Sequence, residues 1–151
     1  MRYGMIIDLQ RCIGCNACTV TCKQKNATPA GVPWCKGRAS HKAGHRQPDK
    51  RGWPVLCMHC ENATCVHVCP TGASYKRSDG IVLVDKDKCI GCRYCMAACP
   101  YDARSFDFGD RTGYFPGKGH NEYEKATLGE FHAGTVTKCI LCADQLDEGE
   151  S

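Results

Sequence analysis

The stretch Cys89-Ile90-Gly91-Cys92-Arg93-Tyr94-Cys95-Met96-Ala97-Ala98-Cys99-Pro100 decides the fold of this protein. Its Cys-x2-Cys-x2-Cys spacing wraps a tight loop around one small inorganic core, on which the thiolates converge. The last cysteine follows one helical turn later and points elsewhere, and Pro100 ends the turn. In iron–sulfur runs of this kind, that last cysteine ligates the second cluster of a pair. The stretch therefore predicts clusters that are held in pairs.

The spacing recurs in four cysteine motifs, which together contain every cysteine except Cys35. We number them 1 to 4 in chain order, so that the stretch quoted above is motif 3. The candidate iron ligands are Cys12, Cys15, Cys18 and Cys22 in motif 1, Cys57, Cys60, Cys65 and Cys69 in motif 2, Cys89, Cys92, Cys95 and Cys99 in motif 3, and Cys139 and Cys142 in motif 4.

Similar segments lead into motifs 1 and 3, which predicts an internal duplication of a strand–loop–helix unit. Tyr3–Leu9 reads as a short buried strand before motif 1, and Gly80–Asp85 reads as another before motif 3. Each motif has a glycine between its first two cysteines, Gly14 and Gly91. A glycine there lets backbone amides approach the cluster sulfurs closely.

Exchange of the last cysteine between neighbouring motifs predicts which thiols share a cluster. The Cys57 set contains Cys57, Cys60, Cys65 and Cys99, and the Cys89 set contains Cys89, Cys92, Cys95 and Cys69. The Cys12 set contains Cys12, Cys15 and Cys18, and the Cys139 set contains Cys139, Cys142 and Cys22. We therefore expect two fully ligated 4Fe-4S clusters within residues 1–151 and four in a longer protein, whose missing thiols lie beyond Ser151. Cys35 is either a substitute ligand or a small buried thiol.

The segments around the motifs predict an α+β fold of duplicated bacterial 2[4Fe-4S] ferredoxin-like modules with long connecting loops. We expect a single iron–sulfur body, with an inner two-cluster module at 53–108 and an outer-cluster module from 1–34 plus 135–151. Lys23–Leu56, rich in Gly, Pro and basic residues, reads as a long surface loop, either a docking face for a partner or a plain connection. Arg104–Lys138 reads as a second connection, with one short helix around Glu122–Glu130.

Composition limits the hydrophobic core, because the chain of 151 residues has only four Phe and two Trp. The clusters must therefore form part of the interior. We expect poor folding without them, since the free energy of metal binding then becomes free energy of folding. The formal net charge of +4 partly balances the negative charge of thiolate-bound clusters.

Disulfide bonds, zinc binding and catalysis account less well for the spacing of the fifteen cysteines. Disulfide frameworks have irregular spacings, and the cysteines of a Cys-x2-Cys pair rarely bridge each other outside redox motifs. A zinc-binding structural or interaction module is the alternative function, but zinc sites use cysteine pairs separated by a longer finger. An active site of the chain's own is not indicated, because the Cys-x3-Cys-x2-Cys triple of radical enzymes and hydrolytic or nucleotide-binding motifs do not occur.

Nucleic-acid binding and a membrane span are not indicated either. The basic residues belong to no recognised helical or sheet reader of nucleic acids. No stretch approaches the roughly 18 apolar residues that a membrane span needs. The N-terminal residues lack the apolar core of a signal peptide and a twin-arginine pair, so we expect no export signal in this chain.

The sequence resembles the four-cluster ferredoxin-type electron-transfer subunits of the dimethyl sulfoxide reductase family, including those of polysulfide, thiosulfate and tetrathionate reductases. The matching residues are Arg2-Tyr3-Gly4-Met5, Gly31-Val32-Pro33-Trp34, Cys57-Met58-His59-Cys60-Glu61-Asn62, Cys69-Pro70-Thr71-Gly72-Ala73 and Lys138-Cys139-Ile140-Leu141-Cys142. The likeness covers nearly the whole chain. It departs at the C-terminus, where the family continues to a further Cys-x3-Cys-Pro segment.

The resemblance implies a non-catalytic subunit that carries electrons between a molybdopterin-containing catalytic subunit and an integral membrane anchor that exchanges electrons with quinone. It also implies a peripheral place on the cytoplasmic membrane, on the periplasmic, outer face, with a cytoplasmic place as the alternative.

Charges and hydrogen bonds beside the clusters set the direction of electron flow in such a relay, because cluster potentials span roughly −700 to +450 mV. Lys23, Arg93, Arg104 and Lys138 are candidates for raising the potential of a neighbouring cluster, and the alternative is that each merely faces water. His59 and His67 are candidates for tuning a cluster through hydrogen bonds.

Overall fold

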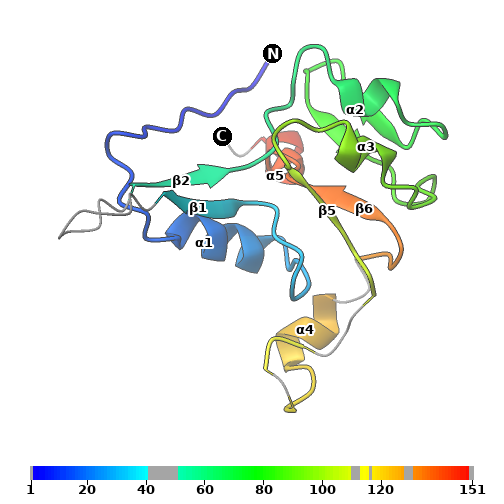
Figure 1. Ribbon diagram of the computed structural model, residues 1–151. Coiled ribbons are helices and arrows are strands. Elements are labelled where there is room, and N and C mark those ends of the chain that lie inside the picture. The colour runs from blue at the N-terminus through cyan, green and yellow to red at the C-terminus, as the bar shows by residue number, and fades with distance from the viewer. Residues whose placement is uncertain (1, 41–50, 110–112, 116, 128–130, 150–151) are drawn as a thin grey trace.

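The computed structural model describes residues 2–40, 51–109, 113–115, 117–127 and 131–149, which form short helices and strands joined by turns (Figure 1). The helices are α1 (Ala17–Lys25), α2 (Thr64–His67), α3 (Tyr94–Ala97), α4 (Glu122–Thr127) and α5 (Ala143–Asp147). The strands are β1 (Lys36–Ser40), β2 (Arg51–Val55), β3 (Ser74–Lys76), β4 (Val82–Val84), β5 (Arg104–Phe106) and β6 (Val136–Lys138).

Within these described residues the strands pair into three separate antiparallel sheets of two strands each. β1 pairs with β2, β3 with β4, and β5 with β6. The third pairing joins distant parts of the chain and places Ser105 opposite Thr137. It brings the strand that follows motif 3 beside the strand that precedes motif 4. The prediction of a connection at Arg104–Lys138 is wrong at both ends of that segment, where β5 and β6 lie.

The two strands predicted ahead of motifs 1 and 3 have different outcomes. Gly80–Asp85 is confirmed as the site of β4, where Ile81 and Val82 are each only 1% exposed. The prediction of a buried strand at Tyr3–Leu9 is wrong, because this segment forms no strand and Ile6 is 96% exposed. The two segments differ in whether a strand lies beside them. β3 hydrogen-bonds to β4, whereas no described strand pairs with the N-terminal segment.

The prediction of a long surface loop at Lys23–Leu56 is wrong in its described part, because that part contains β1 and β2 and buried side chains. Trp34 is buried and packs in one cluster with Cys35, Leu56, Phe131 and Cys139. Its indole Nε1 donates a 2.8 Å hydrogen bond to Thr137 Oγ1 on β6. Residues 41–50, which the prediction also covers, lie outside the described residues.

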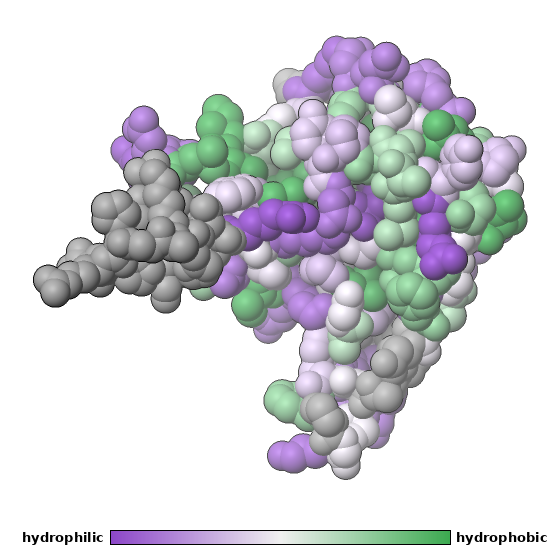
Figure 2. All heavy atoms as spheres, in the orientation of Figure 1, coloured by the Kyte–Doolittle hydropathy of each residue, from purple (hydrophilic) through white to green (hydrophobic). Residues whose placement is uncertain are grey.

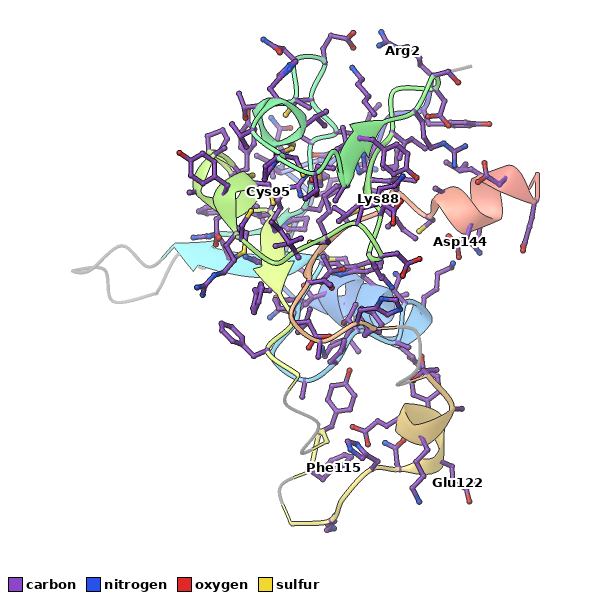
Figure 3. All side chains as sticks on the ribbon, turned by 90° about the vertical axis from the view of Figure 1, so that its right-hand side faces the viewer. Arg2, Lys88, Cys95, Phe115, Glu122 and Asp144 are labelled. Atoms are coloured by element: carbon purple, nitrogen blue, oxygen red, sulfur yellow. The ribbon has the colours of Figure 1, made fainter. Side chains whose placement is uncertain are left out.

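Helix α4 confirms the short helix predicted around Glu122–Glu130 as far as Thr127, and residues 128–130 lie outside the described part. Asn121 and Glu124 form a reciprocal cap, each side chain accepting the other's backbone N–H at 2.8 Å. The helix projects below the rest of the molecule in Figure 1, and Phe115 and Glu122 lie on this projection in Figure 3. The hydroxyl of Tyr123 ties it back by donating to the carbonyl of Gln24 on α1.

None of the helices in the described part of the chain has the length and hydrophobicity that a bilayer crossing needs. Exposed hydrophobic residues are scattered over the face seen in Figure 2 and are not gathered in one patch.

Candidate metal centre

All four cysteine motifs make the same backbone turn two residues after their first cysteine. The residue there has a left-handed conformation, with φ of 69° at Gly14, 45° at His59, 68° at Gly91 and 55° at Leu141. In motifs 2 and 4 the backbone N–H of this residue donates to the first sulfur at 3.4 Å, from His59 to Cys57 and from Leu141 to Cys139.

The turn is strained at His59 and Leu141, since the left-handed conformation costs an L-residue about 1–2 kcal/mol. Strain of this kind persists where the surroundings fix it and clusters at functional sites. The sequence indicates this turn only at Gly14 and Gly91, because a histidine or leucine carries no signal for a left-handed backbone.

A second shared turn follows the second cysteine in motifs 1 and 3. Asn16 and Arg93 both have φ of 61°, and α1 and α3 begin directly after them. The third cysteine of each motif, Cys18 or Cys95, therefore lies in the first turn of a helix. Cys65 has the same place in α2. This equivalence supports the predicted duplication.

The four thiols of the Cys57 set lie around one small cavity, whose lining contains all four cysteines and Arg104. Burial raises the pKa of the Cys60 thiol, and the nearby Cys57, Cys65 and Cys99 raise it further. All cysteines of the chain are free of disulfides. Motifs 2 and 3 are also tied together through the Thr64 hydroxyl, which donates to the Ala98 carbonyl at 3.0 Å. The structure therefore brings Cys99 of motif 3 to the thiols of motif 2.

In the Cys89 set, the structure brings Cys89 close to Cys95. Burial raises the pKa of Cys95, and Cys89 acts in the same direction. Cys89 Sγ accepts the N–H of Val136 at 3.5 Å, and Cys69 Sγ accepts the N–H of Ser74 at 3.4 Å. Burial opposes ionisation of Cys69, but hydrogen bonds from Ser74 and Thr71 hold its pKa below the ordinary value. Cys92 is exposed.

The Cys139 set brings Cys22 of motif 1 close to Cys139 and Cys142 of motif 4. Burial raises the pKa of Cys22, and the neighbouring Cys142 raises it further. Burial likewise raises the pKa of Cys139, with Cys22 among the groups that add to it. An ion pair of 2.6 Å between Lys25 and Asp144 holds α1 against α5 beside these thiols.

The Cys12 set is the most open of the four. Cys15 and Cys18 are exposed, and the thiol of Cys18 contacts Cys35. Cys35 itself is only 6% exposed and accepts a hydrogen bond of 3.8 Å from the Thr19 hydroxyl. Burial raises its pKa to about 11. Cys35 is thus a buried thiol, and its role as a substitute ligand stays a prediction.

Two of the predicted tuning cations are buried. Arg104 and Lys138 are each 2% exposed, so the alternative that each charge faces water is wrong for these two. Arg104 Nη1 donates to Ser74 Oγ at 2.9 Å, its guanidinium also bonds Cys95, and its Nη2 is buried without a described partner. Lys138 Nζ donates to the carbonyls of Val82 and, at 2.8 Å, Cys139. Neither forms an ion pair with a described carboxylate.

In the described part of the chain, the side chains of the other tuning candidates form no hydrogen bond to a thiol, and His59 reaches Cys57 only through its backbone N–H. Lys23 donates to the Pro29 carbonyl at 2.7 Å, and the Arg93 guanidinium lies 5.2 Å from the ring centroid of Phe106. His59 Nδ1 accepts the N–H of Val82 at 3.0 Å, and His67 Nε2 pairs with the side chain of Asn62. Burial, aided by Lys138, lowers the pKa of His59 to about 4.

These residues fit a 4Fe-4S cluster at the Cys57 set. The donors are four thiols around one cavity that Arg104 also lines, and Arg104 Nη2 is buried without a described partner. A buried cation costs several kcal/mol unless an opposite charge compensates it, and a thiolate-bound cluster is such a charge. No three Cys, His, Asp or Glu side chains in the described residues lie at the distances that one metal ion requires. A cube of four irons spreads its thiolates over a larger core than one ion does.

Comparison with known proteins identifies iron–sulfur domains in this chain. Residues 11–73 and residues 51–113 both match families described as a 4Fe-4S dicluster domain. The thiosulfate reductase electron transfer subunit PhsB of Salmonella typhi is 51% identical, over 99% of this chain and 68% of its own length.

Two further relatives have similar names. A putative dimethyl sulfoxide reductase iron-sulfur subunit of Halobacterium salinarum is 42% identical over 97% of this chain and 59% of the relative. A tetrathionate reductase subunit of Salmonella typhimurium is 46% identical over 98% of this chain and 51% of the relative. The chain thus spans between half and about two thirds of the length of these relatives. The zinc alternative finds no support among them.

Proposed function

The chain belongs to the family of iron–sulfur electron-transfer subunits of reductases such as those for dimethyl sulfoxide, thiosulfate and tetrathionate. On that premise we propose that it relays electrons between a quinone-linked membrane anchor and a molybdopterin-containing catalytic subunit, and that it has no active site of its own. The names of the relatives as iron-sulfur or electron transfer subunits support this role.

The observation that carries the proposal is the cavity of the Cys57 set with Arg104 in its lining. A bound 4Fe-4S cluster would supply one-electron chemistry with little rearrangement. The protein's own part is to hold the thiols and to stabilise their negative charge. Backbone N–H groups of His59, Ser74, Val136 and Leu141 do this by donating to Cys57, Cys69, Cys89 and Cys139.

We propose the ligand sets that the sequence predicts, with Cys99 and Cys69 exchanged between motifs 2 and 3. Paired mutants test the exchange through iron content and electron paramagnetic resonance (EPR) signals. Cys99→Ala should remove one cluster, about four iron atoms per chain. Adding Cys60→Ala should remove no more iron, because both thiols serve one cluster, whereas adding Cys92→Ala should remove a second. The reverse pattern would refute the exchange.

The proposed role is tested on the complete natural protein, tagged and purified from detergent-solubilised membranes. A molybdenum-containing subunit and an integral membrane protein should copurify in stoichiometric amounts, and reduced quinone analogues should bleach the iron–sulfur absorbance. Recovery of the protein alone, without molybdenum, would count against the role.

We also propose the finer architecture, an α+β fold of two ferredoxin-like modules. Support comes from the β3–β4 and β5–β6 pairs beside motifs 2 and 3, and from the contact of Trp34 with Thr137, which joins 1–34 to 135–151. For location we propose the outer face of the cytoplasmic membrane. Protease added to intact spheroplasts should then digest the protein, and digestion only after lysis would indicate the cytoplasmic side.

A further inference from the structure

We infer that Arg104 and Lys138 are positioning charges that raise the reduction potential at the Cys57 set above that at the Cys89 set. The inference rests on the proposed function, since it requires clusters in both sets. It goes beyond that function because it orders two sites of the relay and assigns the order to two side chains.

Arg104 lies between the two sets. It lines the cavity of the Cys57 set, and its Nη2 is buried without a described partner. On the other side its guanidinium bonds Cys95 and, through Nη1, the hydroxyl of Ser74, whose backbone N–H donates to Cys69. Arg104 therefore faces thiols of both sets, and its positive charge acts on both.

Lys138 lies on another side of the Cys57 set. Its Nζ donates to the carbonyl of Val82, a residue that lines the same cavity, and to the carbonyl of Cys139. The thiols whose charge acts most on Lys138 are Cys57, Cys139 and Cys65. The Cys57 set is thus flanked by two buried cations, whereas among the described side chains the contacts of the Cys89 set point to Arg104 alone.

The electrostatic consequence follows from Coulomb's law in a poorly screened interior. An added electron makes a thiolate-bound cluster more negative, and a nearby fixed positive charge stabilises that state. The potential of a cluster therefore rises with each buried cation beside it. Because two buried cations flank the Cys57 set, this site should hold an electron more tightly than the Cys89 set does.

Lys88 provides a matched control. It directly precedes Cys89, as Lys138 directly precedes Cys139. Its side chain, however, is 66% exposed and forms a 3.0 Å ion pair with Asp85. Water and the carboxylate screen its charge, so its removal should change little.

The experiment is an EPR-monitored redox titration of the iron-loaded, full-length protein carrying Lys138→Met, Arg104→Met or Lys88→Met. The signal of the Cys57 set is assigned as the one missing in Cys99→Ala. We expect Lys138→Met to shift the redox equilibrium of that signal at least tenfold toward the oxidised form, which is 59 mV for a one-electron couple. The Cys89-set signal should shift less than threefold. Arg104→Met should lower both potentials, and Lys88→Met neither.

Two results in variants with normal iron content would overturn the inference. One is a shift in Lys138→Met no larger than in Lys88→Met, and the other is an equal shift of both signals. If a methionine variant holds less iron, the variants Lys138→Arg and Arg104→Lys, which keep the positive charge, test the inference instead. Normal iron and a potential near the wild type in these variants support the role of charge, whereas loss of iron or a lowered potential overturns it. Absence of iron from the wild type itself would instead refute the proposed function.

Discussion

Alanine at Gly91 should damage the protein far more than alanine at Gly14, although the two glycines have equivalent places in motifs 3 and 1. Both have a left-handed backbone, with φ of 68° and 69°. A side chain in that conformation costs about 1–2 kcal/mol at either position. The difference comes from what each new Cβ meets.

At Gly91 the added Cβ would overlap the carbonyl oxygen of Gly134 and lie 3.2 Å from Phe106 Cε2. Gly134 is in the turn that leads to β6, so relief requires a backbone shift in that turn. At Gly14 the nearest atom is Gly52 Cα at 3.2 Å, a contact that a small adjustment relieves. Overpacking that moves backbone costs typically about 1–3 kcal/mol more. The extra cost at Gly91 is therefore about 2 kcal/mol, a factor of about 30 in the population of the opened loop.

The assay is the rate at which an excess of chelator takes up iron from the loaded protein under anaerobic conditions. Local opening of a motif precedes the loss of its cluster, so the rate follows the population of the opened loop. Each variant is compared with the wild type. Gly91→Ala should accelerate release from motif 3 about 30-fold more than Gly14→Ala accelerates release from motif 1. Equal acceleration, or a larger effect at Gly14, would refute the steric argument.

Three other predictions concern the rest of the molecule. Trp34→Phe leaves the buried Thr137 hydroxyl without its partner, which costs about 1–3 kcal/mol, so iron release should begin at lower urea than in Trp53→Phe. Complete removal of iron should abolish most of the far-UV circular dichroism, and a native-like spectrum of the iron-free chain would contradict the proposed dependence of folding on clusters. Hydrogen bonds of 2.7 and 2.5 Å from Arg77 hold the pKa of Asp147 below its usual value. The stability that this ion pair contributes is therefore fully present above the usual carboxyl pKa. It is lost as pH falls through the lowered pKa of Asp147. Arg77→Met should return the pKa, measured by nuclear magnetic resonance, to the ordinary range, and an unchanged value would exclude this contact.

The sequence predicted those features that depend on local spacing. The order of the motifs gave the Cys57 set, whose four members line one cavity, although they come from two motifs. The strand at Gly80–Asp85 was also predictable, because its apolar run is local and its partner β3 lies just before it.

Features that depend on distant partners were not predictable. The apolar run in Tyr3–Leu9 resembles that of β4, but no described strand lies beside it, so Ile6 remains 96% exposed. The β1 sequence Lys-Gly-Arg-Ala-Ser has no alternation of apolar residues and reads as loop. The burial of Arg104 and Lys138 depends on the pairing of β5 with β6, which are separated along the chain by residues 107–135.

The contact of Cys22 with Cys139 and Cys142 has a consequence for biosynthesis. A ribosome makes the N-terminal end first, at about 5–20 residues per second, so Cys22 leaves the tunnel on the order of ten seconds before its companions exist. The inner thiols, by contrast, emerge close together in time. Metal loading by the cell's assembly factors should therefore be able to start at the Cys57 and Cys89 sets, and the Cys139 set should be filled after them.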